Sequence, residues 1–174
     1  NDIKKKRLLY DKSEDIYFTI YNILLILNYL GCINGDKAFE DYRKLTFLIP
    51  IISDETLNTI FINYYRGKCE INKNIRRRLS KIYNEGIESI PLIRHILLIL
   101  EERNFIKLIE GKNKVNLYLC QHSNLENFLV NEIFKDEIRY INNIKRGDYQ
   151  IAKVSYSTFI NNLFKLNGVS IWEE

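Results

Sequence analysis

The side chains in this sequence that are most able to bind a ligand are basic, and they gather in three clusters. The clusters are Lys4, Lys5, Lys6 and Arg7; Lys73, Arg76, Arg77, Arg78 and Lys81; and Lys112 and Lys114. Grouped cations bind the phosphates of nucleic acids without sequence preference and in a salt-dependent way. They are also common on helix faces that contact only water. We treat six of them as candidate DNA or phosphate contacts: Lys73, Arg76, Arg77, Lys81, Lys112 and Lys114.

Metal and nucleotide chemistry find little support in the sequence. No Gly-rich phosphate-binding loop of the Walker or dinucleotide type is present. His95 and His122 are the only histidines, and the one cysteine close to either in sequence is Cys120. A zinc site needs three or four convergent ligands. The sequence therefore predicts neither a metal nor a cofactor.

The acidic residues do not form a catalytic pair. Asp54 and Glu55 are adjacent in a predicted helix, and so are Glu101 and Glu102. Neighbouring residues of a helix point about 100° apart, so neither pair can converge on one substrate. Because no acid–base pair or activated nucleophile is recognisable, we expect no enzymatic activity.

Composition sets the broad class of the protein. The formal net charge of +4, from 26 basic and 22 acidic residues, is too small for a dedicated nucleic-acid binder. The hydrophobic fraction of 46% is enough to build a core. An odd number of cysteines without CxxC spacing, and no recognisable signal peptide, predict a reduced, cytoplasmic protein. The longest apolar runs, both ILLIL, are too short to cross a membrane.

Helical periodicity dominates the chain, and capping residues, Gly and Pro separate the apolar segments. We expect Ser13 to open the first helix and Gly31, Gly67, Gly86 and Gly168 to end four of the helices. The predicted helices cover residues 13–30, 36–50, 53–67, 72–86, 89–100, 123–145 and 148–168. The segment before Ser13 is unpatterned, so the predicted organisation is a basic arm at 1–12 and a single mostly helical domain at 13–174.

The segment RHILLILEERNFIKLIEGKNKVNLYLC, residues 94–120, predicts a helix followed by a hairpin. Its two halves, FIKLIE and KVNLYL, alternate with period two around GKN, which is typical of a short antiparallel hairpin near residues 105–119. A helix followed by such a hairpin has the outline of a winged helix. The helix at 90–100 is apolar nearly all round, so we expect it to lie in the core. The predicted fold is mainly α with one winged-helix-like element.

The C-terminal tail VSIW ends in the single tryptophan, Trp172. Tyrosine and tryptophan often anchor protein interfaces, and this chain has 12 Tyr. The tail is compatible both with folding back on its own helices and with docking on a partner. The residues that we predict as partner contacts are Leu166, Val169, Ile171 and Trp172.

Three segments together resemble a known family. They are YRKLTFLIPIISDETLNTI (42–60), the helix and hairpin at 90–119, and AKVSYSTFINNLFKLNGV (152–169). In this order they resemble the middle component of three-component ABC-ATPase systems, the small subunit of Lamassu-like bacterial defence operons. The resemblance implies a non-catalytic adaptor that joins an SMC-like or Rad50-like ABC ATPase to an effector, such as a nuclease, against phage or plasmids. It also implies that DNA is met through the complex.

The leading hypothesis is therefore an adaptor subunit, and the alternative is a stand-alone winged-helix DNA-binding regulator. A regulator would need a helix that presents polar and basic groups to the major groove. The helix at 90–100, just before the predicted wing, is too apolar to read base edges. This favours the adaptor.

Overall fold

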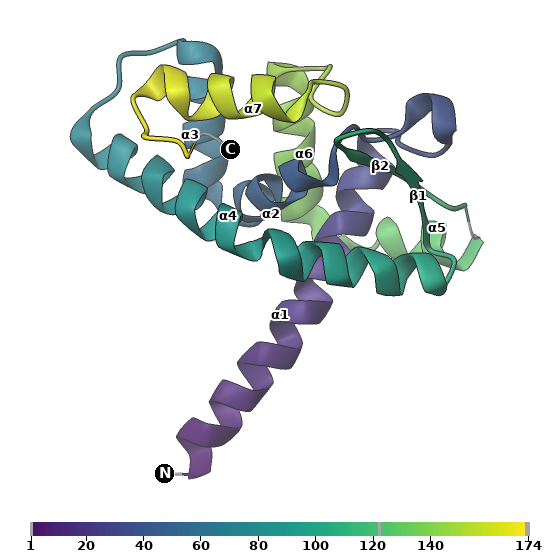
Figure 1. The fold of residues 1–174 in the computed structure, drawn as a ribbon. Helices are drawn as coiled ribbons and strands as arrows, with labels where there is room; N and C mark the ends of the chain where they lie inside the picture. Colours follow the sequence, from purple (N-terminus) through teal and green to yellow (C-terminus); the bar gives the residue numbers. More distant parts are fainter. Residues whose placement is uncertain (1, 122, 173–174) are drawn as a thin grey trace.

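The computed structural model describes residues 2–121 and 123–172, with side chains from residue 16 onward except those of residues 123 and 124. It is mainly helical with one small antiparallel sheet, which confirms the predicted fold class (Figure 1). The α-helices are α1 (Asp2–Tyr29), α2 (Leu45–Ser53), α3 (Glu55–Tyr64), α4 (Lys73–Glu102), α5 (Ser123–Leu129), α6 (Lys135–Gly147) and α7 (Tyr156–Leu163). The strands are β1 (Ile106–Glu110) and β2 (Val115–Leu119). Short 3-10 helices are η1 (Gly35–Lys37), η2 (Tyr42–Lys44), η3 (Tyr65–Gly67), η4 (Glu132–Phe134) and η5 (Lys165–Asn167).

Helix α1 is longer than predicted, because it begins at Asp2 and not after a cap at Ser13. Its end agrees with the prediction: Gly31 follows it with a φ of 73°, in the left-handed region that suits glycine. In Figure 1 the second half of α1 is enclosed by the other helices, whereas its first half projects away from the body. The enclosed half carries the buried run from Ile23 to Leu27.

Helix α4 corrects two predictions. We expected Gly86 to end one helix and a second to start near Ser89, but α4 continues through Gly86 and Pro91. Gly86 serves close packing, since a Cβ there would lie 2.4 Å from Cε1 of Phe47 in α2. The hydroxyl of Thr46 also donates to the Gly86 carbonyl at 2.6 Å. The expected N-cap is confirmed, because the side chain of Asn72 accepts from the N–H of Ile75.

The second half of α4 is not apolar all round, as the sequence suggested. One side is buried, and the other exposes five residues of the predicted helix: Pro91, Leu92, Arg94, His95 and Leu98. The half-helix is therefore a wall of the core with one outer face.

The predicted helix over residues 36–50 is wrong in its first part. Phe39 is extended and pairs with Leu117 of β2, donating at 2.7 Å and accepting at 3.0 Å. The short turn η1 ends at Lys37, and the continuous helical part begins at Tyr42 and continues past Pro50 to Ser53. The long-range pairing of the fully buried Phe39 outweighs the local helical pattern around it.

The predicted helix over residues 123–145 is interrupted after Leu129. Asn131 caps the turn η4 by accepting from the N–H of Ile133 at 3.1 Å, and α6 begins at Lys135. The predicted start at Ser123 is confirmed, since α5 begins there.

The last predicted helix starts later than expected. Turns follow Asp148, and α7 begins at Tyr156, where the Ser155 hydroxyl accepts from the N–H of Thr158 at 3.2 Å. The helical segment ends at Gly168, as predicted, with a φ of 73°.

Helix α2 is the centre of the core. It packs against α1, α3, α4 and α6, and its residues from Leu45 to Ile52 are buried apart from Pro50. The ring of Phe47 lies 6.1 Å from that of Tyr83 in α4 and 5.2 Å from that of Phe164, centroid to centroid. This aromatic cluster ties the C-terminal segment to the rest of the molecule.

The hairpin agrees with the prediction. Strands β1 and β2 pair antiparallel from Ile106↔Leu119 to Glu110↔Val115. Leu117 is fully buried, and β1 packs against α4, so the hairpin lies on the body of the protein.

No single helix in the described ranges has the length and apolar character needed to cross a membrane. The segments 42–53 and 55–67 reach that standard only when combined, and a bend of 117° separates them.

Candidate interaction surfaces

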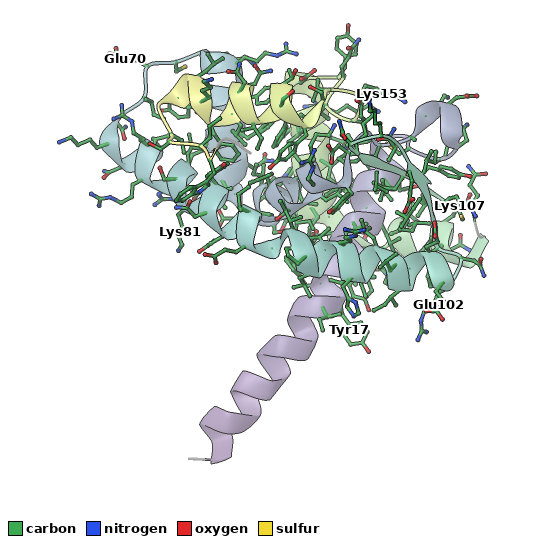
Figure 2. All side chains as sticks on the ribbon, viewed as in Figure 1. Tyr17, Glu70, Lys81, Glu102, Lys107 and Lys153 are labelled. Atoms are coloured by element: carbon green, nitrogen blue, oxygen red, sulfur yellow. The ribbon has the colours of Figure 1, made fainter. Side chains whose placement is uncertain are left out.

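An apolar groove of about 790 Å³ lies between α1, the end of α4 and α5, and we call it the α1–α4–α5 groove. It includes Tyr17, whose side chain lies beside α1 in Figure 2, and Phe128, which are 59% and 36% exposed. The lining residues are Ile16, Tyr17, Ile20, Tyr21, Leu24, Ile99, Leu100, Arg103, Phe105, Leu125 and Phe128.

The groove forms because α1 extends past the edge of the core. The buried run ends at Ile23, and the preceding turns carry large apolar side chains with fewer neighbours. The rings of Tyr17 and Tyr21 are stacked 6.4 Å apart, and Tyr21 is 5.4 Å from Phe128. One wall is therefore aromatic and partly open to water. The sequence analysis missed this groove, since its walls come from three distant segments.

The predicted phosphate contacts on α4 share one exposed region. Lys73, Arg76, Arg77 and Lys81 are all exposed in the first half of the helix. Lys73, Arg77 and Lys81 lie on the side away from the buried Leu79, whereas Arg76 lies about 60° from Leu79, next to Gly168. Lys81 makes only a loose surface ion pair with Glu85, at 3.8 Å. The remaining charges are therefore available to an anion.

The hairpin cations lie elsewhere. Lys114 pairs with Glu40, and Lys112 shares a shallow polar hollow with Arg94. Arg94 is seventeen residues beyond Arg77, or about 25 Å along α4. The structure thus separates the two predicted sets of phosphate contacts. Residues 4–7 lie in α1, but their side chains are outside those described.

The predicted partner contacts of the tail differ in their exposure. Leu166 and Trp172 are 54% and 73% exposed, Ile171 is half-buried, and Val169 is buried at 5%. The backbone N–H of Trp172 donates to the hydroxyl of Tyr83 in α4 at 2.9 Å. The tail backbone therefore folds back on α4, while the indole of Trp172 stays in solvent.

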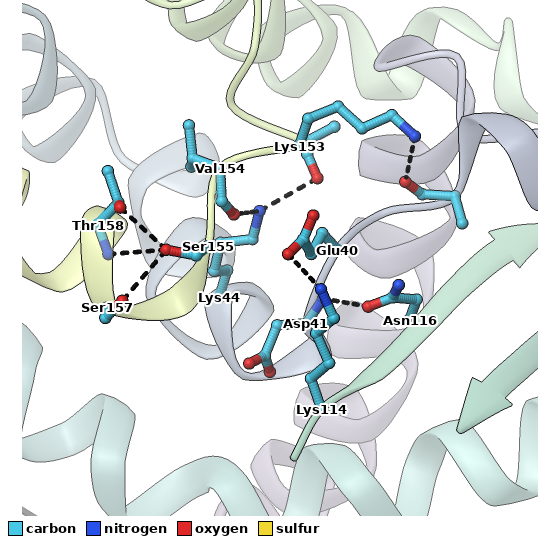
Figure 3. Close-up of polar contacts among 12 residues, drawn as sticks. Glu40, Asp41, Lys44, Lys114, Asn116, Lys153, Val154, Ser155, Ser157 and Thr158 are labelled. Carbon is cyan, nitrogen blue, oxygen red and sulfur yellow. Dashed lines mark hydrogen bonds and ion pairs between the residues drawn. The ribbon is translucent and has the colours of Figure 1, made fainter. Parts of the chain in front are cut away.

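A buried lysine was also missed by the sequence analysis. Lys44 is fully buried, and its Nζ donates to the carbonyls of Ile151, Ala152 and Val154 at 2.9, 3.1 and 2.7 Å. Figure 3 shows the Nζ of Lys44 beside Val154, with Glu40 close by. Because three carbonyls take up the three ammonium hydrogens, Lys44 acts as a clamp between η2 and the turn before α7. In the sequence Lys44 looks like a surface lysine, because the carbonyls that it binds lie more than 100 positions away.

Lys44 makes the stability of the protein depend on pH. Burial lowers its pKa from 10.5 to about 7. Between these values the unfolded chain holds a proton that the folded chain has released, so stability should rise with pH, by at most about 1.4 kcal/mol per unit. We expect the difference in unfolding free energy between the wild type and a Lys44→Met variant to grow between about pH 7 and pH 9.

Denaturant titration of both proteins measures this difference, and groups common to both cancel. The range stops at about pH 9, because the Cys32 thiol, whose pKa burial raises to about 11, also responds to the charge of Lys44 and therefore does not cancel between the two proteins. A difference that stays constant over the range would mean that folded Lys44 keeps its proton.

No three His, Cys, Asp or Glu side chains converge on a metal-sized site within the part of the chain that the structure describes. Comparison of the chain with family models, with curated proteins and with solved structures gives no match. The resemblance to the ABC-ATPase systems therefore stays a prediction from sequence.

Proposed function

We propose that this protein is a non-catalytic adaptor that joins an SMC-like ABC ATPase to an effector subunit in a bacterial defence complex against phage or plasmids. The observation that carries the proposal is the α1–α4–α5 groove. Partly exposed aromatic and aliphatic side chains that line one concave surface are typical of a protein-binding site.

The shape of the groove suits a helix. Its walls are helices, and its residues Ile16 and Ile20 repeat at the spacing that packs against an apolar helical stripe. The resemblance to the ABC-ATPase systems makes a helix of the ATPase the proposed occupant. The projecting first half of α1 starts beside the groove and would extend the contact (Figure 1).

An adaptor also needs a second surface away from the first. Trp172 sits beside Tyr83, and Ile99 of the groove is sixteen residues further along α4, or about 24 Å. The two surfaces can therefore be occupied at the same time. We assign the groove to the ATPase.

The regulator alternative receives less support. The outer face of α4 just before the hairpin includes Leu92 and Leu98, which are 49% and 52% exposed and cannot hydrogen-bond to base edges.

Co-purification tests the adaptor. The tagged chain is expressed with the products of its neighbouring genes, and a large coiled-coil ATPase should be recovered with it. A Tyr17→Glu variant should reduce that recovery more than about ten-fold, because it places a charge in the centre of the apolar contact. Tyr17 is 59% exposed, so the fold should be retained, with unchanged circular dichroism.

The matched control is Tyr149→Glu. Tyr149 is 80% exposed and lies in the turn between α6 and α7, outside the groove. It should leave recovery unchanged. Equal recovery with both variants would reject the groove as the docking site, and failure to recover any ATPase with the wild type would reject the adaptor.

A further inference from the structure

The charge of this protein is concentrated at one end. Residues 66–85 contain seven basic residues and two acidic ones, whereas the rest of the chain, with 19 basic and 20 acidic residues, is nearly neutral. The modest overall charge of +4 therefore hides a strongly basic end, formed by the loop before α4 and its first turns. We call it the basic end and define it by Lys68, Lys73, Arg76, Arg77, Arg78 and Lys81, all exposed.

The C-terminal tail crosses this end. The Arg76 guanidinium lies over Gly168, since a Cβ added at Gly168 would be 3.2 Å from its Nε. Two turns further along α4, the Tyr83 hydroxyl holds the backbone of Trp172. The tail thus places the indole of Trp172 within about 11 Å, along the helix, of the level of Arg76.

The combination is chemically selective. Exposed cations attract phosphates, but they do not distinguish paired from unpaired strands. A fixed, solvent-exposed indole adds a flat surface on which an unpaired base can stack, and in a duplex the base faces are hidden. The tail is anchored on both sides of Ile171, by the buried Val169 and by the Tyr83 hydrogen bond. Binding of a ligand should therefore cost little conformational entropy in the tail.

We propose that the basic end binds single-stranded nucleic acid, with its phosphates on Arg76, Lys73 and neighbouring cations and with a base stacked on Trp172. The site does not use the α1–α4–α5 groove, but it shares Trp172 with the second surface proposed for the adaptor, so nucleic acid and a protein partner would compete for the tail. Binding at this site should not depend on the nucleotide sequence, because every nucleotide offers a base to stack and a phosphate to contact.

The protein contains one tryptophan, so fluorescence excited at a wavelength that tyrosine does not absorb reports on this site alone. The isolated full-length chain is titrated with an oligothymidine of about 15 nucleotides, long enough for one such site. The oligonucleotide should quench Trp172. Heparin, a polyanion without bases, should bind the basic end with little quenching. Equal quenching by heparin, or none by the oligonucleotide, would overturn the proposal.

Affinity variants separate stacking from charge. With a fluorescently labelled oligonucleotide, Trp172→Ala should weaken binding by roughly five- to hundred-fold, and Trp172→Phe should recover part of the loss. Tyr17→Ala is the aromatic control, because Tyr17 lies far from Lys81 in Figure 2 and should not matter. An unchanged affinity of Trp172→Ala would exclude stacking.

The salt dependence tests the cations. A Lys73→Ala/Arg76→Ala double variant should flatten the slope of log K against log salt by about 1.4, the value for two lost phosphate contacts on a single strand. Lys107→Ala should leave the slope unchanged, since Figure 2 shows Lys107 at the opposite end from Lys81. A slope that both variants change equally would place the binding elsewhere.

A matching duplex completes the test. It should bind more weakly than the single strand and should not quench Trp172. Tighter binding to the duplex would overturn the proposal. So would a Trp172 signal that responds only to a co-purified protein, because the tail would then belong to a protein interface.

Discussion

Replacing Lys44 with methionine is expected to lower the free energy of unfolding by about 3 kcal/mol, because it removes the donor for buried carbonyls without removing the volume of the side chain. Ala152 keeps a second donor, the N–H of Glu40 at 2.8 Å. The loss therefore falls on the carbonyls of Ile151 and Val154. Chemical denaturation at pH 7 measures the change, and the variant should unfold in one earlier transition.

Lys135→Met is the control for this substitution, because Lys135 is exposed at the start of α6. It should change stability by no more than about 0.5 kcal/mol. If Lys44→Met proves as stable as the wild type, the cost of burying the ammonium equals the gain from its three hydrogen bonds, and the clamp contributes no net stability.

Gly86→Ala is expected to destabilise the protein by about 2 kcal/mol, although the same exchange inside an open helix stabilises it by about 1 kcal/mol. The new methyl group would lie 2.4 Å from Cε1 and 2.5 Å from Cδ1 of Phe47. Phe47 is fully buried and its ring packs against those of Tyr83, Phe159 and Phe164, so it cannot turn aside without disturbing the whole cluster.

Thermal and denaturant unfolding of Gly86→Ala test this sign directly. Asn84→Ala, at an exposed position two residues earlier in α4, isolates helix propensity and should be neutral or slightly stabilising. A stabilised Gly86→Ala protein would show that α4 and α2 can move apart at little cost.

Several features of the fold follow from local sequence signals. Asn72 as an N-cap, Gly31 and Gly168 as stop signals, and the hairpin around residues 111–114 each depend on a few neighbouring residues. Turn chemistry and capping act over one or two turns, so the sequence alone reveals them.

The predictions are wrong where contacts between residues far apart in the sequence determine the local structure. Gly86 looks like a helix stop, but its role is to admit Phe47, which lies 39 positions earlier. Phe39 leaves a helical pattern to pair with Leu117. The groove and the Lys44 clamp likewise need segments that only the folded chain brings together. Of the candidate contacts, exposure on α4 was readable from helical periodicity, whereas the burial of Val169 was not.

The uninterrupted course of α4 has a geometric consequence. Its 30 residues form a helix about 45 Å long, with the basic end on its first turns and the groove on its last. The backbone is helical along the whole segment, so α4 sets the separation and the rotational phase of two ligands held at its ends, although Pro91 leaves one backbone hydrogen bond unmade. One residue inserted in the middle of α4 would lengthen the helix by about 1.5 Å and turn one end by about 100° relative to the other. The length of this one helix therefore determines both the distance and the relative orientation of the two surfaces.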